Sequence, residues 1–354
     1  MRVGLHPNLR NGILGLDSKK FQDILNYNKI DNQILYAGDE NFWSKVAKCN
    51  FFIFQWTQRD YYRQIAQTIL PIIENQLNIK CFPNHLSSWI YDDKIRQYFL
   101  LKLHHFPAIK SWIFYDIDHA LNFINKAEFP LVFKLRSGAG SKMVKLLKNK
   151  KAAKNFTRLM FQDGVNYSRG LPWESLDYIK KKGTIRLIRI KLGQLKRKVM
   201  EGRKYFDEDW FIHKNYLFLQ KYMPDNKYDT RVVIIGKQAF AFQRQNFAND
   251  FRASGSGENI YDPRQIDLAF VEIAFQVSKY FGFDSMAYDF LYDKNKKPAI
   301  AEISYVFGSK QGTKISNCPG FWDERMAWHE GKQDVAHSML SNFLDKPDLK
   351  MIPE

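Results

Sequence analysis

The stretch SMAYDFLYDKNKKPAIAEIS, residues Ser285–Ser304, predicts a β-hairpin. Its two β-rich runs flank a polar turn, and such runs bounded by Asp, Asn and Pro are typical of hairpins. If the turn centres between Asn295 and Lys296, Asp289 lies opposite Glu302, with the two Cβ atoms roughly 5 Å apart. Facing carboxylates repel each other, unless a divalent cation such as Mg²⁺ lies between them. The alternative is an ordinary hairpin with one exposed and one neutral carboxylate.

A second hairpin is predicted upstream, in YDTRVVIIGKQAFAFQRQ (Tyr228–Gln245), with its turn at Gly236–Lys237. In its first strand Arg231 shares a face with Val233 and Ile235. An arginine on the same face as core residues must be paired or must meet an anion. Arg231 is therefore a candidate for binding an anionic group.

Two loops rich in Gly and Ser are further candidates for anion binding. The first, SGAGS (Ser137–Ser141), follows a predicted strand, PLVFK, that ends at Lys134. Backbone N–H groups of such a loop can close over phosphates while the lysine supplies a point charge; a plain turn is the alternative. The second loop, NDFRASGSGENIYD (residues 249–262), carries Arg252. Its guanidinium offers a fork for a carboxylate or phosphate, or else a salt bridge that stabilises the loop.

The first 90 or so residues alternate strands with helices, which predicts a small α/β domain with a parallel sheet. No GxGxxG motif follows any of these strands, so a dinucleotide site is not expected. A strong helix is predicted next, over Tyr91–His105, with Asp92 or Asp93 as its N-cap. The predicted N-terminal strands are RVGLH, QILYAG, FFIFQW and IKCFPN, and the other predicted helices are Ser18–Tyr27, Asp60–Leu77, Ile117–Lys126, Asp267–Phe281 and Val335–Leu344.

The composition indicates a globular protein with two or three domains. The 354 residues are 45% hydrophobic and 16% aromatic, and no apolar run approaches the roughly 18 residues of a membrane span. The N-terminus, MRVGLHPNLR, lacks the apolar core of a signal peptide. Three widely spaced cysteines without a metal-ligand pattern indicate reduced thiols in a cytoplasm. We expect a cytoplasmic protein.

The formal net charge of +17 is concentrated in one segment. Residues 142–214 contain 20 Lys and Arg against 7 Asp and Glu, which favours anionic partners. The centre of this basic block, residues 180–204, alternates aliphatic and basic side chains. It could bind an anionic membrane surface at the inner face of the membrane, or be a solvated surface with ordinary aliphatic burial. Nucleic acid is a less expected partner.

Four motifs in order carry a resemblance to a known superfamily. They are DK at a helix start (Asp93–Lys94), PLVFK before a Gly-rich loop, QKY with DTR soon after, and an Asp followed by EIS on a hairpin. This order resembles the ATP-grasp superfamily, which includes D-alanine–D-alanine ligase, glutathione synthetase, biotin carboxylase and the ribosomal-protein glutamate ligases. The resemblance covers roughly residues 80–308.

The resemblance implies a mixed α/β and α+β fold. A parallel pre-ATP-grasp α/β domain, residues 1–90, would be followed by a two-lobed ATP-grasp fold. The N-terminal lobe with its basic insertion would span residues 91–216. The C-terminal lobe, residues 217–354, would carry the metal-binding hairpin and a C-terminal tail.

The resemblance also implies roles for individual residues. ATP phosphates would contact Lys94, Lys134 and the Gly-rich loop, through Ser137, Gly138, Gly140 and Ser141. The backbone of the hinge between the lobes would hold the adenine edge, at Gln220, Lys221, Tyr222 and Met223. Asp225 or Asp229 could hold the ribose or orient neighbouring residues. Arg231 would lie near the γ-phosphate, or near the acyl phosphate once it forms. Asp289 and Glu302 would hold Mg²⁺, which Mn²⁺ could replace. The family usually has Asn where this chain has Ser304, which could bind the metal through its hydroxyl or a water.

Acceptor binding is expected elsewhere in the C-terminal part. Arg252 would bind the acceptor or the intermediate, with the backbone of Ser254, Gly255 and Ser256 as an anion-binding nest. Trp322 and His329 lie in an aromatic segment, GFWDERMAWHEG, that could line a sugar- or peptide-binding mouth. Plain packing is the alternative for these aromatic residues.

The implied activity is an ATP-dependent carboxylate–amine ligase. ATP and Mg²⁺ would convert a substrate carboxylate to an acyl phosphate, and an amine would displace phosphate. The acceptor could be an acidic sugar, a cell-surface glycan precursor or an amino acid, and a homodimer is possible. The alternatives are an ATP-grasp kinase, which transfers phosphate to its acceptor, and a non-catalytic protein that binds ATP or polyanions.

Overall fold

The computed structural model describes most of the chain, in two compact units. Unit 1 consists of Met1–Lys110 and Met223–Glu354, and unit 2 of Ser111–Tyr222. The described residues are 1–10, 13–14, 16–57, 59–138, 143–166, 211–247, 250–253, 258–307 and 315–353. The first and last of the three predicted domains thus lie largely within the same unit, and the three-domain division itself stays a prediction.

The N-terminal part of unit 1 is a parallel sheet with the strand order β4-β1-β5-β6, which confirms the predicted α/β arrangement. Its strands are β1 (Arg2–Leu5), β4 (Asp31–Ile34), β5 (Phe51–Ile53) and β6 (Lys80–Phe82), and the associated helices are α1 (Leu16–Tyr27), α2 (Phe42–Val46), α3 (Asp60–Leu77), α4 (His85–Ile90) and α5 (Lys94–Leu103). The predicted helix at Tyr91–His105 is shorter than expected, because α4 ends at Ile90 and α5 begins only after its N-cap, Asp93.

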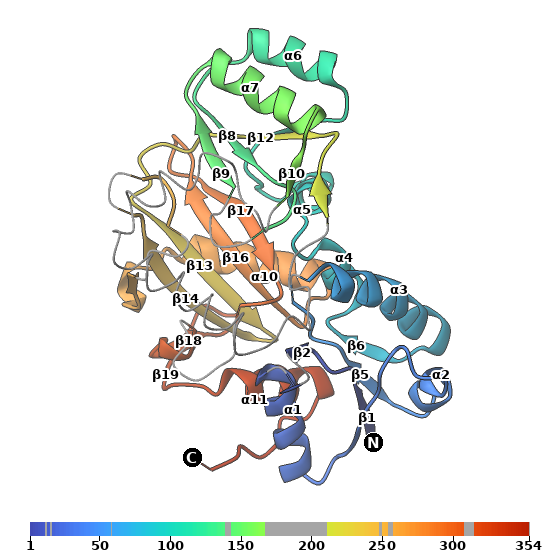
Figure 1. Cartoon of the computed structure of the whole chain (residues 1–354). Coiled ribbons are helices and arrows are strands. Elements are labelled where there is room, and N and C mark those ends of the chain that lie inside the picture. The colour runs from blue at the N-terminus through green and yellow to red at the C-terminus, as the bar shows by residue number, and fades with distance from the viewer. Residues whose placement is uncertain are drawn as a thin grey trace, which may run out of the picture. The chain divides into compact units, whose positions relative to one another are not determined.

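The C-terminal part of unit 1 is a largely antiparallel sheet with β17, β16, β13 and β14 side by side, as Figure 1 shows. These strands are β13 (Tyr228–Ile235), β14 (Gln238–Gln245), β16 (Ser285–Tyr292) and β17 (Pro298–Ser304). The short strands β15 (Asn259–Ile260), β18 (Gly320–Trp322) and β19 (Trp328–Glu330) extend the β14 side, and the helices are α10 (Leu268–Phe281) and α11 (Val335–Leu344). Both predicted hairpins are confirmed.

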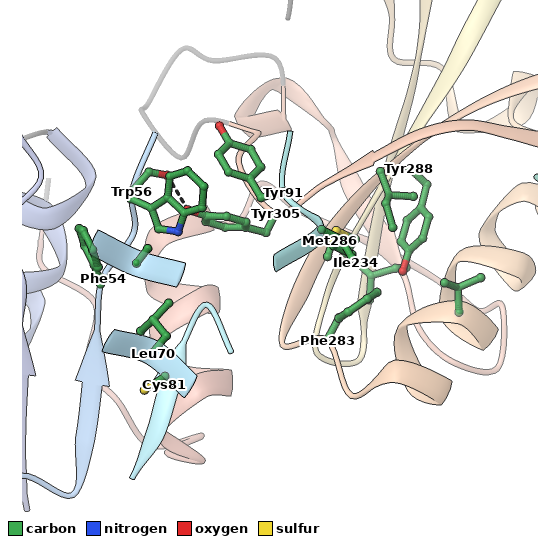
Figure 2. Close-up of a cluster of buried hydrophobic side chains, with 14 of the residues drawn as sticks. Phe54, Trp56, Leu70, Cys81, Tyr91, Ile234, Phe283, Met286, Tyr288 and Tyr305 are labelled. Atoms are coloured by element: carbon green, nitrogen blue, oxygen red, sulfur yellow. Dashed lines mark hydrogen bonds between the residues drawn. The ribbon is translucent and has the colours of Figure 1, made fainter. Parts of the chain in front are cut away.

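The two faces of this sheet bury different sets of side chains. On one face, Val232, Ile234 and Tyr288 pack with α10 and with aromatic residues of the N-terminal part, such as Trp56. Figure 2 shows this cluster, where Trp56, Tyr91 and Tyr305 meet, and where Tyr305 Oη donates to the Trp56 carbonyl. The two parts of unit 1 therefore share one hydrophobic core.

The opposite face is divided along its length. At one end Val233, Ile235 and Phe240 pack with α11, which also packs on α1. At the other end the same face carries charged residues, since side chains two apart on a strand share a face. These charged residues form the candidate site.

Unit 2 has an antiparallel sheet with the order β7-β12-β8-β9. Its strands are β7 (Ser111–Phe114), β8 (Leu131–Lys134), β9 (Val144–Leu147) and β12 (Leu217–Lys221), and its helices α6 (Ile117–Lys126) and α7 (Lys150–Phe161) lie together over the sheet in Figure 1. A small antiparallel pair, β10 (Val165–Asn166) and β11 (Ile212–His213), follows α7.

The remaining assigned elements are short. They are the strand pair β2 (Leu9–Arg10) and β3 (Ile13–Leu14) and the 3-10 turns η1 (Pro263–Gln265) and η2 (Ile315–Asn317). Within the described residues, none of the helices combines the length and the apolar character needed to cross a membrane.

Candidate functional site

A cluster of paired charges lies on three adjacent strands, β14, β13 and β16. Arg231 lies directly opposite Asp289, and its Nε and Nη2 donate to the two carboxylate oxygens at 2.7 and 2.8 Å. Arg244 lies opposite Asp229, with two N–H···O bonds of 2.6 Å, and its Nη2 also contacts Asp289 Oδ2 at 2.7 Å. Arg244 thus bridges two carboxylates. The prediction that Arg231 must be paired or meet an anion is confirmed through this pairing.

Burial and the arginines act in opposite directions on the two carboxylates. Burial alone would raise the pKa of Asp289, but Arg231 and Arg244 hold that pKa well below its usual range. Burial raises the pKa of Asp229 despite its bonds to Arg244. Burial opposes the charge of Arg244 itself, and the two carboxylates nevertheless raise its pKa. The cluster is therefore a tightly coupled set in which Asp289 is firmly ionised.

Glu302 reaches this cluster from β17 because of a β-bulge. Near the turn the pairs are Tyr292 with Pro298 and Phe290 with Ile300, a register that would continue with Ala301 opposite Asp289. The irregularity between Asp289 and Phe290 leaves Ala301 of β17 as an extra residue, so that Glu302 faces Asp289 instead. The predicted pairing of the two carboxylates is confirmed.

Lys94 approaches Glu302 from the start of α5. Its Nζ lies 3.1 Å from Glu302 Oε1, and the lysine side chain is only 6% exposed. Asp93 caps the helix by accepting a hydrogen bond from the Arg96 backbone N–H at 3.0 Å. A second link holds α5 against the hairpin, since Gln97 Oε1 accepts from the Ile303 backbone N–H at 3.2 Å.

The carboxylates and basic side chains of the cluster suit a cation bound to phosphate better than a free cation. Mg²⁺ is typically held by one or two carboxylates together with substrate phosphates, and Asp289 and Glu302 offer those carboxylates on facing strands. Both are already paired with basic side chains. Ser304 Oγ donates to the Val306 carbonyl at 2.9 Å. Within the described residues, no group of three or more His, Cys, Asp and Glu side chains could hold a metal ion.

The predicted phosphate-binding residues of unit 2 lie at the end of β8. Lys134 is the last residue of that strand and is paired with Val144 of β9. Ser137 and Gly138 follow, and Gly138 has a positive φ of 114°, a backbone conformation that glycine adopts readily. Gly140 and Ser141 lie outside the described residues. Ser137 Oγ lies 3.0 Å from His213 Nε2.

The predicted adenine hinge spans the point where the chain leaves unit 2 for unit 1. Tyr222 is the last residue of unit 2 and Met223 the first of the second part of unit 1. Gln220 is buried in β12, and its amide donates to Ser111 Oγ at 3.3 Å, while Lys221 is exposed. Met223 packs with Ile109.

Only some of the residues expected to bind the acceptor lie in the part of the chain that the structure describes. Arg252 is paired with Asp250, with Nη2 and Oδ2 2.9 Å apart, while Ser254, Gly255 and Ser256 lie outside the described residues. Trp322 is buried in the shared core, with its ring against Trp328. His329 Nε2 lies 2.9 Å from Asp323 Oδ2, and its ring stacks on Phe321 at 4.9 Å between centroids.

Three residues that the structure brings to these sites were not predicted from the sequence. Arg244 could have been found, because a turn at Gly236–Lys237 places it opposite Asp229. His213 and Tyr216 had no such signal, since they contact a loop 76 or more residues away in the chain.

Comparisons with known proteins bear on the fold. No family model and no curated protein sequence matches the chain, whereas solved structures match it almost end to end. A RimK domain ATP-grasp protein from Sphaerobacter thermophilus has a TM-score of 0.53 at 11% identity, covering 97% of this chain and 100% of that one. A D-alanine–D-alanine ligase from Bacillus anthracis, complexed with ATP, has a TM-score of 0.56 at 13% identity, with coverages of 98% and 97%.

A third structure, the D-cycloserine synthetase DcsG, has a TM-score of 0.52 at 11% identity and covers 99% of this chain and 100% of its own. These likenesses extend over nearly the whole chain, so the chain has the ATP-grasp fold. Identities this low show the fold alone. The predicted architecture, a parallel N-terminal sheet followed by antiparallel sheets, is confirmed.

Proposed function

We propose that this chain is an ATP-dependent ligase that joins a carboxylate to an amine through an acyl phosphate. The observation that carries the proposal is the charge cluster of unit 1, in which Glu302 with Lys94 faces Asp289 with Arg231 on paired strands of an ATP-grasp fold. Carboxylates for a cation and basic side chains for phosphates are what phosphoryl transfer requires.

In this proposal ATP supplies the phosphoryl group and Mg²⁺ neutralises charge on its phosphates. Asp289 and Glu302 would hold the cation, while Lys94 would neutralise phosphate oxygens. Arg231, whose side chain is 20% exposed, would turn one of its remaining N–H groups toward the γ-phosphate or the acyl phosphate. Arg244 is 2% exposed and would keep Asp289 ionised and in place.

Residues of unit 2 and of the loops have proposed roles as well. Lys134 and Ser137 would contact phosphates, as would the rest of the Gly-rich loop. The backbone of residues 220–223 would hold adenine, and Arg252 the acceptor or the intermediate. The excess of basic residues supports an anionic acceptor, such as an acidic sugar, a glycan precursor or an amino acid; the basic block itself lies mostly outside the described residues.

The experiment is a screen of carboxylates against amines that follows ADP and phosphate together. A ligase releases both products only when both substrates are present. In the same assay Glu302→Ala should lose turnover, because one of two metal carboxylates is gone, and Glu272→Ala, an exposed carboxylate on α10, should retain it. Wild-type rates in Glu302→Ala would contradict the site. ADP release with phosphate retained on the acceptor would instead identify a kinase, and binding without turnover a non-catalytic protein.

A further inference from the structure

A chain of hydrogen bonds in unit 2 connects two buried residues to the start of the Gly-rich loop. The Arg136 backbone N–H donates to Tyr216 Oη at 2.8 Å, Tyr216 Oη lies 3.0 Å from His213 Nδ1, and His213 Nε2 lies 3.0 Å from Ser137 Oγ. His213 is 2% exposed and Tyr216 4%. Ser137, at the end of this chain, is only partly buried.

The backbone around His213 is fixed independently of these side-chain bonds. His213 pairs with Val165 in the β10–β11 ladder, and the Asn215 backbone N–H donates to the carbonyl of Met160 in α7 at 2.9 Å. Asn215 has a φ of 61°, so the chain turns tightly between His213 and Tyr216. A fixed backbone and buried rings leave the imidazole little freedom to change its orientation toward Ser137.

The first donor favours one direction for these hydrogen bonds. A backbone N–H can only donate, so Tyr216 Oη accepts from Arg136, and a hydroxyl that both accepts and donates gives its own hydrogen to His213 Nδ1. A neutral imidazole whose Nδ1 accepts carries its hydrogen on Nε2. The Nε2–H group then donates to Ser137 Oγ, and the hydroxyl hydrogen of Ser137 remains for an acceptor outside this chain of bonds.

We propose that His213 is a positioning residue that turns the Ser137 hydroxyl into a donor for a phosphate oxygen of the bound nucleotide. This inference rests on the proposed function, since it takes ATP as the ligand of the loop. In the opposite tautomer, with the hydrogen on Nδ1, Ser137 would donate to Nε2 and its hydroxyl would face phosphate without a hydrogen. The tautomer therefore decides whether the loop begins with a donor or an acceptor.

The test measures ATP binding to the full chain by calorimetry, with adenosine as a probe that lacks phosphates. Ser137→Ala and His213→Leu should each weaken ATP binding about tenfold, the value of one ordinary hydrogen bond. The double variant should also lose about tenfold, and not a hundredfold, because both changes remove the same bond. His213→Gln, whose amide can still donate to Ser137 and accept from Tyr216, should recover most of the affinity. Adenosine binding should be equal in all four variants.

The tautomer has its own readout, in the ¹⁵N chemical shifts of the His213 ring, which differ between a protonated and an unprotonated nitrogen. We expect the hydrogen on Nε2 in the unmodified chain. Tyr216→Phe keeps the imidazole and serves as a second variant if His213→Leu does not fold. It should shift the ring hydrogen of His213 toward Nδ1 and weaken ATP binding. The inference would be overturned by a hydrogen on Nδ1 in the unmodified chain, or by a hundredfold loss of ATP affinity in the double variant. Absence of ATP binding by the unmodified chain would overturn the proposed function, whereas ATP binding that His213→Leu leaves unchanged would overturn this inference alone.

Discussion

Arg244 is enclosed more completely than Arg231, with 2% against 20% of its side chain exposed. It contacts two carboxylates, Asp229 and Asp289, whose side chains are only 14% and 12% exposed, so that water compensates little of their charge. The network therefore depends on this arginine, although its strand, β14, is two strands from that of Asp289 and three from that of Glu302. Buried ion networks of this kind are costly to interrupt because the remaining charges stay buried.

The first prediction concerns the removal of that cation. Arg244→Met keeps much of the aliphatic volume but leaves Asp229 and Asp289 without a shared partner, so we expect the free energy of unfolding to fall by about 3–5 kcal/mol. Denaturant titration followed by circular dichroism measures it. Arg264→Met is the matched control, because Arg264 makes a similar forked contact to Asp262 with an 87% exposed side chain. Equal losses in the two variants would show that burial does not govern the effect.

His6 makes stability depend on pH. Burial among Phe54 and Tyr36 lowers the pKa of His6 from 6.5 to about 4. Between these two values the unfolded chain binds more protons than the folded one, so stability falls as the pH falls. At pH 5 the cost is about 2 kcal/mol, and at pH 7 it is almost absent.

His6→Asn can still donate to the Pro7 carbonyl but does not titrate. We therefore expect it to lose about 2 kcal/mol less than the unmodified chain between pH 7 and pH 5, measured by urea unfolding at both values. His119→Asn, an exposed histidine on α6, should leave the pH dependence unaltered. If His6→Asn shows the same pH dependence as the unmodified chain, His6 is not the titrating group.

The N-cap residue of helix α5, Asp93, directly precedes Lys94 of the candidate site. Asp93→Ala should cost about 1 kcal/mol of stability and also weaken ATP binding, since the first turn would no longer hold Lys94 beside Glu302. Asp93→Asn keeps a capping oxygen and should recover both. Thermal unfolding and calorimetry measure the two effects.

The N-cap of α6, Asp116, separates capping from site geometry. Asp116→Ala removes a comparable cap and should lower stability without a change in ATP affinity. A drop in affinity as large as that of Asp93→Ala would mean that helix fraying in general, and not the position of Lys94, controls binding.

At the scale of elements, the sequence predicted what depends on local patterns. Alternating β-formers and turn residues located both hairpins, and Asp93 and Asp267 mark the starts of α5 and α10 as N-cap residues. The pairing of Asp289 with Glu302 was predicted from a turn centred between Asn295 and Lys296. Near the turn the observed register differs from that prediction by one residue, with Tyr292 opposite Pro298. The bulge then restores the predicted pairing of Asp289 with Glu302. Bulges of this kind have no clear signal in AEIS.

Across the whole molecule, the cluster in unit 1 has no net charge, since Lys94, Arg231 and Arg244 balance Asp229, Asp289 and Glu302. A bare divalent cation gains little there, whereas a cation that arrives with a polyphosphate brings its own compensation. We expect Mn²⁺ to bind weakly to the nucleotide-free chain and much more tightly when ATP is bound. Mn²⁺ should then raise the affinity for ATP by the same factor by which ATP raises the affinity for Mn²⁺. Electron paramagnetic resonance of free Mn²⁺ measures this. Tight Mn²⁺ binding without nucleotide would contradict it.

Contacts between distant parts of the chain were beyond the reach of patterns. Lys94 meets Glu302 across 208 residues, and His213 meets Ser137 across 76; nothing local in the sequence records either pair. The order of four short motifs along the chain nevertheless indicated the fold. The solved structures that share this fold at 11–13% identity show how little else in the sequence the fold requires.

The interrupted layout of unit 1 also has a consequence for biosynthesis. Trp56 and Phe54 share their core with Val232 and Tyr288, yet between 176 and 234 residues separate these partners along the chain. At about 5–20 residues per second, the first 110 residues emerge from the ribosome roughly 10–40 s before the strands that complete their core. During that interval the aromatic side chains of the nascent N-terminal part lack the strands that cover them in the folded unit, and exposed apolar surface of this kind promotes aggregation.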